Sequence, residues 1–345
     1  MEIKQNYNLS KLNTFGIDVN AKFFAEINQA EELPQLFSSK EFKENEKIFL
    51  GGGSNVLFTR DWNGIAILNK LKGIKILEED AKSAIVRAMG GEIWHDLVEF
   101  AVARGYWGIE NLSLIPGSVG AAPMQNIGAY GAELKNTLES VEAYEVATGK
   151  KNIFSREECV LGYRDSIFKN THKGRYFISA ITLKLNKNGE GNTTYKILKD
   201  YLEKNNTTVK SPKDISDAVA AIRRSKLPDP KEIGNAGSFF KNVFVTAVQL
   251  KNLQINYSEI SFFEEDDKIK IPAAWLIERA GPSTKLGTSW KGYREGRVGV
   301  HEKQALVLVN YGGATGAEIL DLAKQIISSV KEKFGLNLVP EVNIV

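Results

Sequence analysis

Short stretches in which apolar residues alternate with polar ones, or form brief uninterrupted runs, recur along the chain as far as residue 185. This pattern is typical of β-strands, because successive side chains of a strand point to opposite faces of the sheet. The pattern predicts strands over residues 21–27, 47–50, 65–68, 83–89, 140–145 and 176–185.

Longer stretches repeat apolar residues at the spacing of an α-helix. They cover residues 92–104, 215–226 and 315–334. The apolar face of the first helix is predicted to consist of Ile93, Leu97, Phe100 and Ala101. Asp214 is the predicted N-cap of the second helix, and Gly335 follows the last residue of the third. Because the strands and helices do not alternate regularly, we predict an α+β fold and not a doubly wound parallel sheet.

The chain of 345 residues is too long for one typical domain, and we divide it into segments 1–71, 72–214 and 215–345. A hydrophobic fraction of 43% and a charged fraction of 25% are ordinary for a globular protein. A net charge of only +3 indicates no nucleic-acid partner. No apolar run reaches the length of a membrane span, and we expect a cytoplasmic protein with no membrane partner.

The cysteine and histidine content excludes other classes of site. One cysteine, Cys159, excludes a disulfide framework, and His95, His172 and His301 are widely separated. No metal site is therefore predicted.

The first stretch with chemical meaning is Gly51-Gly52-Gly53-Ser54-Asn55, directly after a predicted strand. Consecutive glycines allow positive φ angles and leave no Cβ atom in the way, so that backbone N–H groups can converge on an anion such as a pyrophosphate. A tight turn capped by the asparagine explains the same residues equally well.

The second such stretch runs from Gly108 to Gly131 and is dominated by small residues between Gly117 and Ala122. It lets backbone lie flat against a planar ligand, and Gln125 and Asn126 can both donate and accept hydrogen bonds. A loop packed closely against another element is the alternative. Neither stretch has the glycine spacing of a Rossmann fold, so a bound dinucleotide would have to be held by two separate loops.

Five ordered motifs together are similar to one family. They are GGGSN, then LIPGSVGAAPMQNIGAYG, then LGYRDS at 161–166, then GNAGSFFKN at 234–242, and PEV at 340–342, and the segment Leu12-Asn13-Thr14-Phe15 fits as well. This order resembles the UDP-N-acetylenolpyruvoylglucosamine reductases, over almost the whole chain. The resemblance implies two FAD-binding domains of the vanillyl-alcohol-oxidase type followed by a third, α+β domain that binds the substrate.

The resemblance also implies the ligands. FAD would bind without a covalent link, and NADPH would be the hydride donor for reduction of UDP-N-acetylglucosamine-enolpyruvate to UDP-N-acetylmuramate. The implied FAD-binding residues are Gly51, Gly52, Gly53, Ser54, Asn55, Pro116, Gly117, Ser118, Gly120, Ala121, Gln125, Asn126, Gly128, Ala129 and Tyr130. The implied substrate-binding residues are Tyr195, Lys226, Asn242 and Gln304. We expect a monomer.

Three residues would carry the chemistry. Arg164 would bind the substrate carboxylate, Ser238 would donate the proton, and Glu341 would orient or carry a proton. From residue type alone, the arginine could instead pair with Asp165, the serine could cap a turn, and the glutamate could lie on the surface. Asn343 stands where arginine is common in similar sequences.

Two other functions remain open from the sequence. One is another FAD-dependent oxidoreductase of the same superfamily that acts on an alcohol or a sugar. The other is a catalytically silent nucleotide-binding module, which would have no reason to keep Arg164, Ser238 and Glu341 together.

Overall fold

The computed structural model describes residues 1–265, 268–282 and 289–345. The chain forms two compact units. The first unit comprises residues 1–7, 20–53 and 62–225, and the second comprises residues 8–19, 54–61 and 226–345. The chain therefore passes between the units more than once, and the three domains proposed from the sequence stay a prediction.

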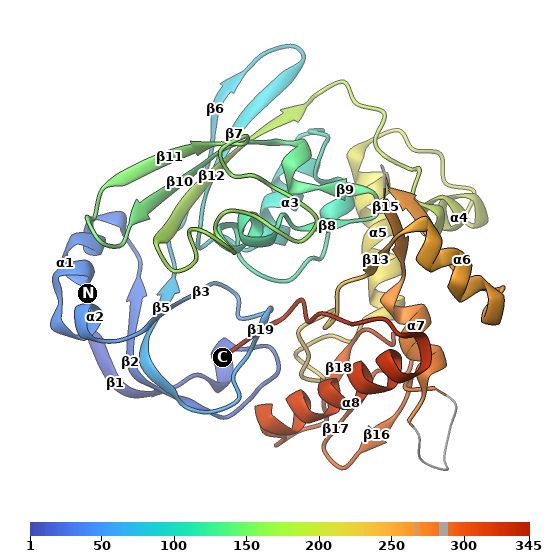
Figure 1. Cartoon of the computed structure of the whole chain (residues 1–345). Helices are drawn as coiled ribbons and strands as arrows, with labels where there is room; N and C mark the ends of the chain where they lie inside the picture. The colour runs from blue at the N-terminus through green and yellow to red at the C-terminus, as the bar shows by residue number, and fades with distance from the viewer. Residues whose placement is uncertain (266–267, 283–288) are drawn as a thin grey trace. The chain divides into compact units, whose positions relative to one another are not determined.

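The first unit contains a four-stranded sheet in the order β1-β2-β5-β3. Its strands are β1 (Ile3–Asn8), β2 (Asn20–Ile27), β3 (Lys47–Leu50) and β5 (Trp62–Asn69). Both β2 and β3 pair with β5 in parallel. The short helices α1 (Leu33–Ser38) and α2 (Lys40–Glu44) lie between β2 and β3 in the chain (Figure 1). Their apolar residues share a core with those of β2 and β5.

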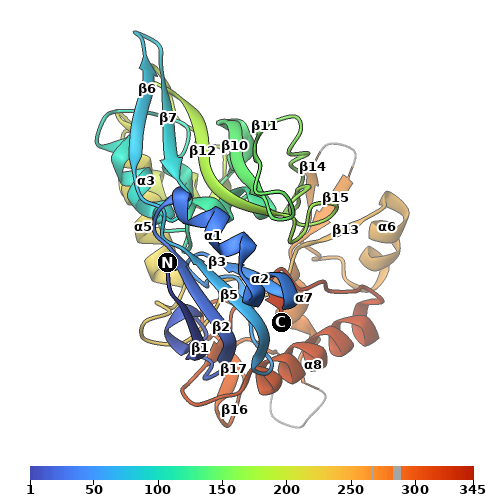
Figure 2. The same cartoon turned by 90° about the vertical axis from the view of Figure 1, so that its left-hand side faces the viewer.

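A five-stranded sheet in the order β11-β10-β12-β7-β6 forms the centre of the first unit, and every neighbouring pair in it is antiparallel. Its strands are β6 (Ile74–Glu79), β7 (Ser83–Met89), β10 (Leu138–Glu145), β11 (Lys151–Ser155) and β12 (Tyr176–Asn186). Figure 2 shows β6 and β7 as a long hairpin that extends this sheet beside β12. All the strands predicted from the sequence are present, with bounds that differ by a few residues.

Helix α3 (Trp94–Val102) covers this sheet, but its buried face differs from the predicted one. Ile93 precedes the helix and is 52% exposed, whereas the buried residues are Trp94, Leu97, Val98 and Ala101. The reason is the Trp94 indole, which is buried and donates a hydrogen bond of 2.9 Å from Nε1 to the Leu112 carbonyl oxygen. The helix is rotated so that this large ring enters the core.

Two further helices, α4 (Lys196–Lys204) and α5 (Pro212–Lys226), share a small core with Trp107 in the first unit. Helix α5 begins earlier than predicted, and Asp214 is not its N-cap. The Asp214 carboxylate lies in the first turn and accepts hydrogen bonds from the backbone N–H groups of Lys210 and Ser211. An acidic side chain in the first turn satisfies exposed N–H groups as well as a cap does.

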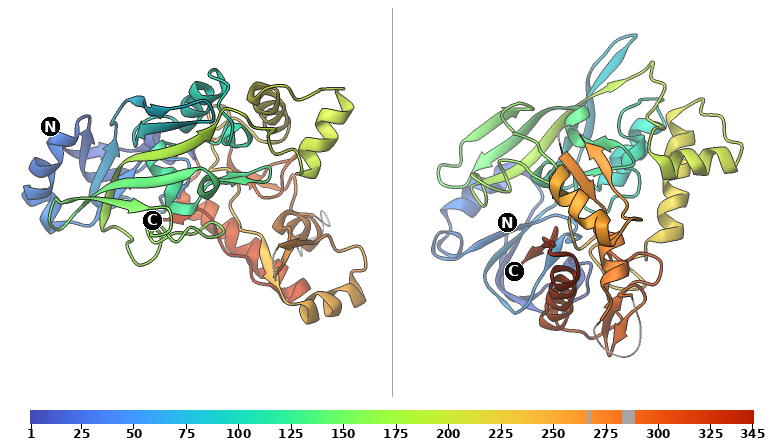
Figure 3. Two further views of the ribbon diagram at one scale, coloured as in Figure 1. Left: turned by 90° about the horizontal axis from the view of Figure 1, so that it is seen from above. Right: turned by 45° about the vertical axis from the view of Figure 1, so that its right-hand side comes forward.

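The second unit is built around the long helix α8 (Gly316–Phe334), the red helix of Figure 3. Thr315 caps its first turn, and Gly335 ends it with a φ of 68°, as the sequence predicts. Helix α8 packs against α7 (Ala273–Ala280) and against the sheet β16-β17-β18. The remaining elements of this unit are α6 (Ala247–Asn256), β13 (Val243–Val245), β14 (Phe263–Glu265), β15 (Lys268–Ile271), β16 (Arg294–Glu295), β17 (Val298–Val300) and β18 (Leu308–Asn310).

Short elements complete the fold. They are the strands β4 (Val56–Leu57), β8 (Gly128–Ala129), β9 (Ala132–Glu133) and β19 (Asn343–Ile344), and the 3-10 turns η1 (Ser10–Leu12), η2 (Ala30–Glu32), η3 (Glu110–Leu112), η4 (Val119–Gln125) and η5 (Leu134–Asn136). The mixture of separate sheets and helices confirms the predicted α+β class. Among the helices of the described ranges, none combines the length and the apolar character that a membrane crossing requires.

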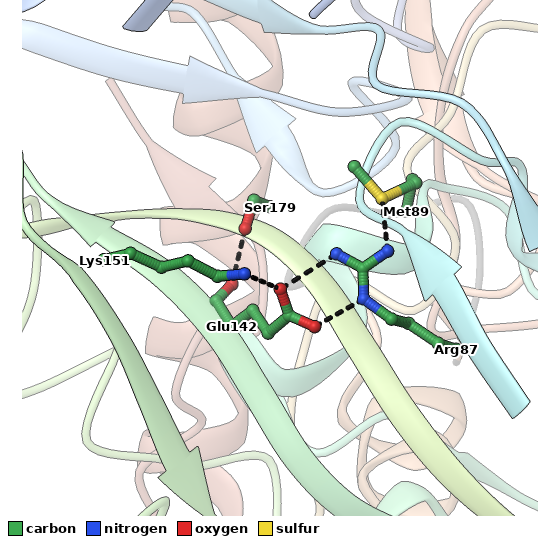
Figure 4. A network of polar contacts seen from close by, with 5 residues as sticks. All are labelled: Arg87, Met89, Glu142, Lys151 and Ser179. Atoms are coloured by element: carbon green, nitrogen blue, oxygen red, sulfur yellow. Dashed lines mark hydrogen bonds and ion pairs between the residues drawn. The ribbon is translucent and has the colours of Figure 1, made fainter. Parts of the chain in front are cut away.

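An ion-pair network joins three strands of the five-stranded sheet (Figure 4). The Arg87 guanidinium forms a bidentate pair with the Glu142 carboxylate, and Lys151 Nζ lies 2.6 Å from Glu142 Oε2. Only 9% of the Glu142 side chain is exposed. The hydrogen bonds from Arg87, supported by Lys151, lower the Glu142 pKa from 4.5 to about 2.

This network predicts a specific acid sensitivity. Because folding favours the ionised Glu142, its contribution to stability is complete above pH 4.5 and is lost as the pH falls toward 2. The difference between the two pKa values corresponds to about 3 kcal/mol at neutral pH. Glu142→Gln should therefore lower the free energy of unfolding at pH 7 and flatten its fall below pH 4.5, as urea titrations at several pH values would measure. The exposed Glu157→Gln variant is the control, and equal acid sensitivity in both variants would contradict the assignment.

Candidate functional site

The two glycine-rich loops of the sequence meet within the first unit. A Cβ atom on Gly51 would collide with Ser118 Oγ, and a Cβ atom on Gly52 would lie 2.9 Å from the Gly117 Cα atom. Real Cβ atoms do not approach backbone this closely. The two backbones are therefore in direct contact, and the loops form one continuous surface in place of two separate turns.

The second loop is held in this position by the turn before α3. Gly117 O accepts from Trp94 N at 3.0 Å, Val119 N donates to Glu92 O at 2.8 Å, and Gly120 N donates to Gly90 O at 2.8 Å. The backbone of residues 117–120 is thus fastened on one side while Gly51 and Gly52 lie on the other. Gly51 and Gly52 therefore serve the close packing of the two loops, and backbone hydrogen bonds hold the second loop in one arrangement.

The contact between the loops predicts a rescue experiment. Gly51→Ala should lower the free energy of unfolding of the apoprotein by about 1–3 kcal/mol, because the new methyl group meets the Ser118 side chain. Ser118→Gly in the same chain removes the obstacle and should restore most of the loss. Gly52→Ala meets the Gly117 backbone and should not be restored by Ser118→Gly. Urea unfolding measures all of these variants, and an unchanged stability of Gly51→Ala would show that the loops do not touch.

Asn126, predicted as a cofactor ligand, serves the loop itself. Its side chain donates from Nδ2 to Glu133 Oε2 and to the Gly162 carbonyl oxygen, and its Oδ1 accepts from Lys135 N. The residue is fully buried, with a left-handed φ of 45°. Its side-chain polar atoms therefore shape the loop, and its role as an FAD ligand stays a prediction. Gln125, beside it, accepts from Lys169 Nζ at 3.2 Å and is partly exposed.

Arg164 lies against this loop. Its backbone has a left-handed φ of 52°, and its Nη2 donates to the Gly128 carbonyl oxygen at 2.7 Å. A Cβ atom on Gly128 would come within 3.0 Å of Arg164 Nη1, so the glycine makes room for the guanidinium. Asp165 Oδ1 accepts from Asn170 Nδ2 at 2.8 Å, which gives this acid a partner of its own.

Two tyrosines and a second arginine accompany Arg164. The Tyr130 and Tyr195 rings meet edge to face with their centroids 5.6 Å apart. Burial raises the pKa of both phenols, although the Tyr195 side chain is partly exposed. Arg223 lies on the last turn of α5, and Tyr130 packs against the core that the buried residues of this helix form. We call Tyr130, Arg164, Tyr195 and Arg223 the arginine–tyrosine cluster.

Side chains of the motif Glu110-Asn111-Leu112-Ser113 hold the segments that carry the arginine–tyrosine cluster. Asn111 Nδ2 donates to the carbonyl oxygens of Tyr130 and Asn192, and thereby ties the glycine-rich loop to the segment before Tyr195. Ser113 Oγ lies 2.7 Å from Ser216 Oγ, which anchors α5. Burial raises the pKa of the Glu110 carboxyl, which accepts from Gly108 N. These buried polar residues are structural, and the sequence did not reveal their partners.

Within the second unit, the fold places the segments of Ser238 and Glu341 side by side. Glu341 N donates to Phe239 O at 2.7 Å, Lys241 N donates to Val339 O at 2.9 Å, and Phe240 faces Pro340 across the same ladder. Both Ser238 and Glu341 are half-buried. Sequence-distant candidates for the proton donor and its carboxylate partner are therefore neighbours in this unit.

The turn that presents Ser238 is shaped by Asn235 and Gly237. Asn235 Oδ1 accepts from Gly237 N at 2.9 Å, and Gly237 has a left-handed φ of 68°. Asn235 N donates to Thr14 O, which explains the motif Leu12-Asn13-Thr14-Phe15 as a scaffold for this turn. Phe239 and Phe240, which follow Ser238, are buried and anchor the end of the turn in the core.

The other predicted substrate ligands occupy defined places. Gln304 opens the turn that leads to Leu306 and Val307, and these residues pair with Phe239 and Ser238. Asn242 Oδ1 accepts from Ala273 N at 3.0 Å at the start of α7. Lys226 is the last residue of α5 and is half-buried. Contact of these residues, and of Arg164, with one substrate stays a prediction.

Comparison with known proteins identifies the family. Residues 21–154 match the FAD binding domain family, and residues 229–345 match the C-terminal domain of UDP-N-acetylenolpyruvoylglucosamine reductase. A UDP-N-acetylenolpyruvoylglucosamine reductase of Flavobacterium johnsoniae is 45% identical over 347 residues, which cover 100% of both chains. One of Amoebophilus asiaticus is 45% identical over 346 residues, again 100% of both chains. The chain belongs to the UDP-N-acetylenolpyruvoylglucosamine reductase family.

The fold agrees with this membership. The crystal structure of UDP-N-acetylenolpyruvylglucosamine reductase (MurB) from Thermus caldophilus matches 99% of this chain and 98% of its own, with a TM-score of 0.65 and 22% sequence identity. At that identity the likeness shows the fold alone. The predicted resemblance, and the predicted FAD-binding part followed by a C-terminal reductase domain, are confirmed.

The candidate residues of this family member divide between the matched segments. Both glycine-rich loops lie within the FAD-binding match. Ser238, Asn242, Gln304 and Glu341 lie within the reductase match. Arg164, Tyr195 and Arg223 lie between the two matches, in the segment that carries most of the arginine–tyrosine cluster. The sequence analysis did not single out Arg223. The signal that could have indicated it is a pair of arginines on a predicted helix just before Lys226.

Proposed function

We propose that this protein reduces the enolpyruvyl group of UDP-N-acetylglucosamine-enolpyruvate to give UDP-N-acetylmuramate, a precursor of peptidoglycan. The observation that carries the proposal is the full-length identity of 45% with curated reductases of this name. Both glycine loops lie within the FAD-binding match, and Gly51 and Gly52 bring them into contact, so that one cofactor could be held by the two loops together. When bound, FAD supplies the carrier for a hydride from NADPH.

The residues of this chain would do the rest of the work. We assign Arg164 to the substrate carboxylate, where a planar guanidinium gives two parallel hydrogen bonds and stabilises the enolate charge that develops on reduction. Ser238 would donate its hydroxyl proton to the adjacent carbon. Glu341, on the segment paired with that of Ser238, would orient the donor or return a proton to it.

The nucleotide part of the substrate needs its own partners. Lys226 offers a point charge and Asn242 a neutral amide for the diphosphate, with Tyr195 and Gln304 as further contacts. We further propose that the enzyme acts as a monomer in the cytoplasm on small-molecule substrates alone.

An anaerobic two-step titration tests the proposal. NADPH should bleach the flavin absorbance of the purified holoenzyme, and UDP-N-acetylglucosamine-enolpyruvate should restore it with formation of UDP-N-acetylmuramate. Simple enol ethers should not restore it. If the bleached protein is re-oxidised by oxygen or an oxidised sugar but not by this substrate, it is a different flavin oxidoreductase. Loss of both steps would indicate a nucleotide-binding protein without catalysis.

A further inference from the structure

Arg223 is a half-buried arginine with one buried guanidinium nitrogen that has no hydrogen-bond partner among the described residues. Its Nε atom is buried and has no hydrogen-bond partner within residues 1–265, 268–282 and 289–345. Over the same ranges it forms no ion pair. A guanidinium nitrogen that loses contact with water normally gains a carboxylate or carbonyl oxygen as a partner in exchange.

The charged neighbours of Arg223 add to the imbalance. Burial lowers the pKa of Arg223, and the positive charge of Arg164 lowers this pKa further. The Tyr130 phenol acts in the opposite direction and raises it. His95 is the other ionisable side chain whose titration responds to Arg223, and burial lowers its pKa as well. The groups that act on the Arg223 charge are thus a phenol and a second cation, and the Tyr130 ring packs against the same core as Ile222 of α5.

The fold does not let Arg223 move away from this position. Ile222 and Val219 on the same helix are buried in the core with Trp107, and Ser216 is fastened to Ser113. Arg224, the next residue, is exposed. A helix anchored in this way keeps Arg223 beside the core against which Tyr130 packs and leaves Arg224 in solvent. An anion that enters the cluster would relieve the repulsion between the two guanidinium groups and satisfy the buried Nε.

We propose that Arg223 is a second cation for the substrate carboxylate and binds it together with Arg164. This assignment rests on the proposed function, because it takes the enolpyruvyl carboxylate as the anion. A single guanidinium can neutralise a carboxylate, but the enolate formed on reduction carries more charge on the same oxygens. Two arginines match that larger charge better than one.

A cycle of ligand and side-chain changes tests the proposal. The ligands are UDP-N-acetylmuramate, which carries the carboxylate, and UDP-N-acetylglucosamine, which lacks it; binding to the oxidised holoenzyme is measured by calorimetry. Arg223→Met should weaken the binding of UDP-N-acetylmuramate about tenfold or more, because a charged hydrogen-bonded contact is lost. It should weaken the binding of UDP-N-acetylglucosamine less than about twofold. Arg224→Met, the exposed control, should change neither. Equal weakening of both ligands, or of neither, would overturn the proposal.

A second measurement separates ligand binding from a structural role. Because Arg223 has no partner of its own, Arg223→Met should leave the thermal unfolding midpoint of the apoprotein unchanged or raise it. A fall of that midpoint would show that the arginine holds the fold. A loss of FAD affinity in place of the carboxylate preference would assign Arg223 to the cofactor and also overturn the proposal. If the wild-type protein binds neither UDP ligand, the proposed function itself fails.

Discussion

Ser238→Ala should leave the bleaching of the flavin by NADPH nearly intact and slow its re-oxidation by UDP-N-acetylglucosamine-enolpyruvate by about 10²–10⁴-fold. The first step needs no proton from the protein, whereas the second places a proton on the carbon next to the new C–H bond. Ser238 stands on a turn fixed by Asn235 and Gly237, so that its hydroxyl is held in place before substrate binds. Stopped-flow absorbance under anaerobic conditions follows the two steps separately.

The control for this experiment is Ser258→Ala, which removes an exposed hydroxyl from the same unit. It should leave both steps unchanged. If Ser238→Ala slows both steps equally, the serine supports the fold of the turn and does not donate the proton. Glu341→Gln, changed on the paired segment, should share the selective effect on the second step if it serves the same proton.

Arg164→Ala should lower kcat/KM for the enolpyruvyl substrate by about 10²–10³-fold. The reason is that the variant loses a hydrogen-bond donor that stabilises the negative charge of the enolate. Arg164→Lys should recover little of the loss. A lysine keeps the charge, but it cannot span the Gly128 carbonyl oxygen and a carboxylate with one planar group. Steady-state rates with varied substrate, at saturating NADPH, measure both variants.

The matched control is Arg156→Ala, a half-exposed arginine of the same unit that pairs with Glu157. Its kcat/KM should equal that of the unchanged protein. An unaltered turnover in Arg164→Ala would remove this arginine from the reaction and leave it as a brace for the loop at Gly128.

The local elements were predictable from the chain because their signals are local. The order of apolar and polar residues shows which side of a strand or helix faces the core, without knowledge of what the core contains. Examples are the strand at residues 83–89 and the helix at residues 315–334. The glycine loops were also visible, since only glycine tolerates the close approach of Gly52 to Gly117. The motifs, taken together, were enough to indicate the family.

What the sequence by itself determined is therefore the strands and helices with the clearest periodicity, the α+β class and the family, while the candidate residues of the site stay predictions. Only the tertiary structure decided which polar side chains the protein satisfies itself. It turned α3 to bury Trp94, engaged every polar atom of the Asn126 side chain, and left Arg223 without a partner among the described residues. The physical reason is that hydrogen-bond partners far apart in the chain, such as the segments of Ser238 and Glu341, are chosen by packing and not by spacing.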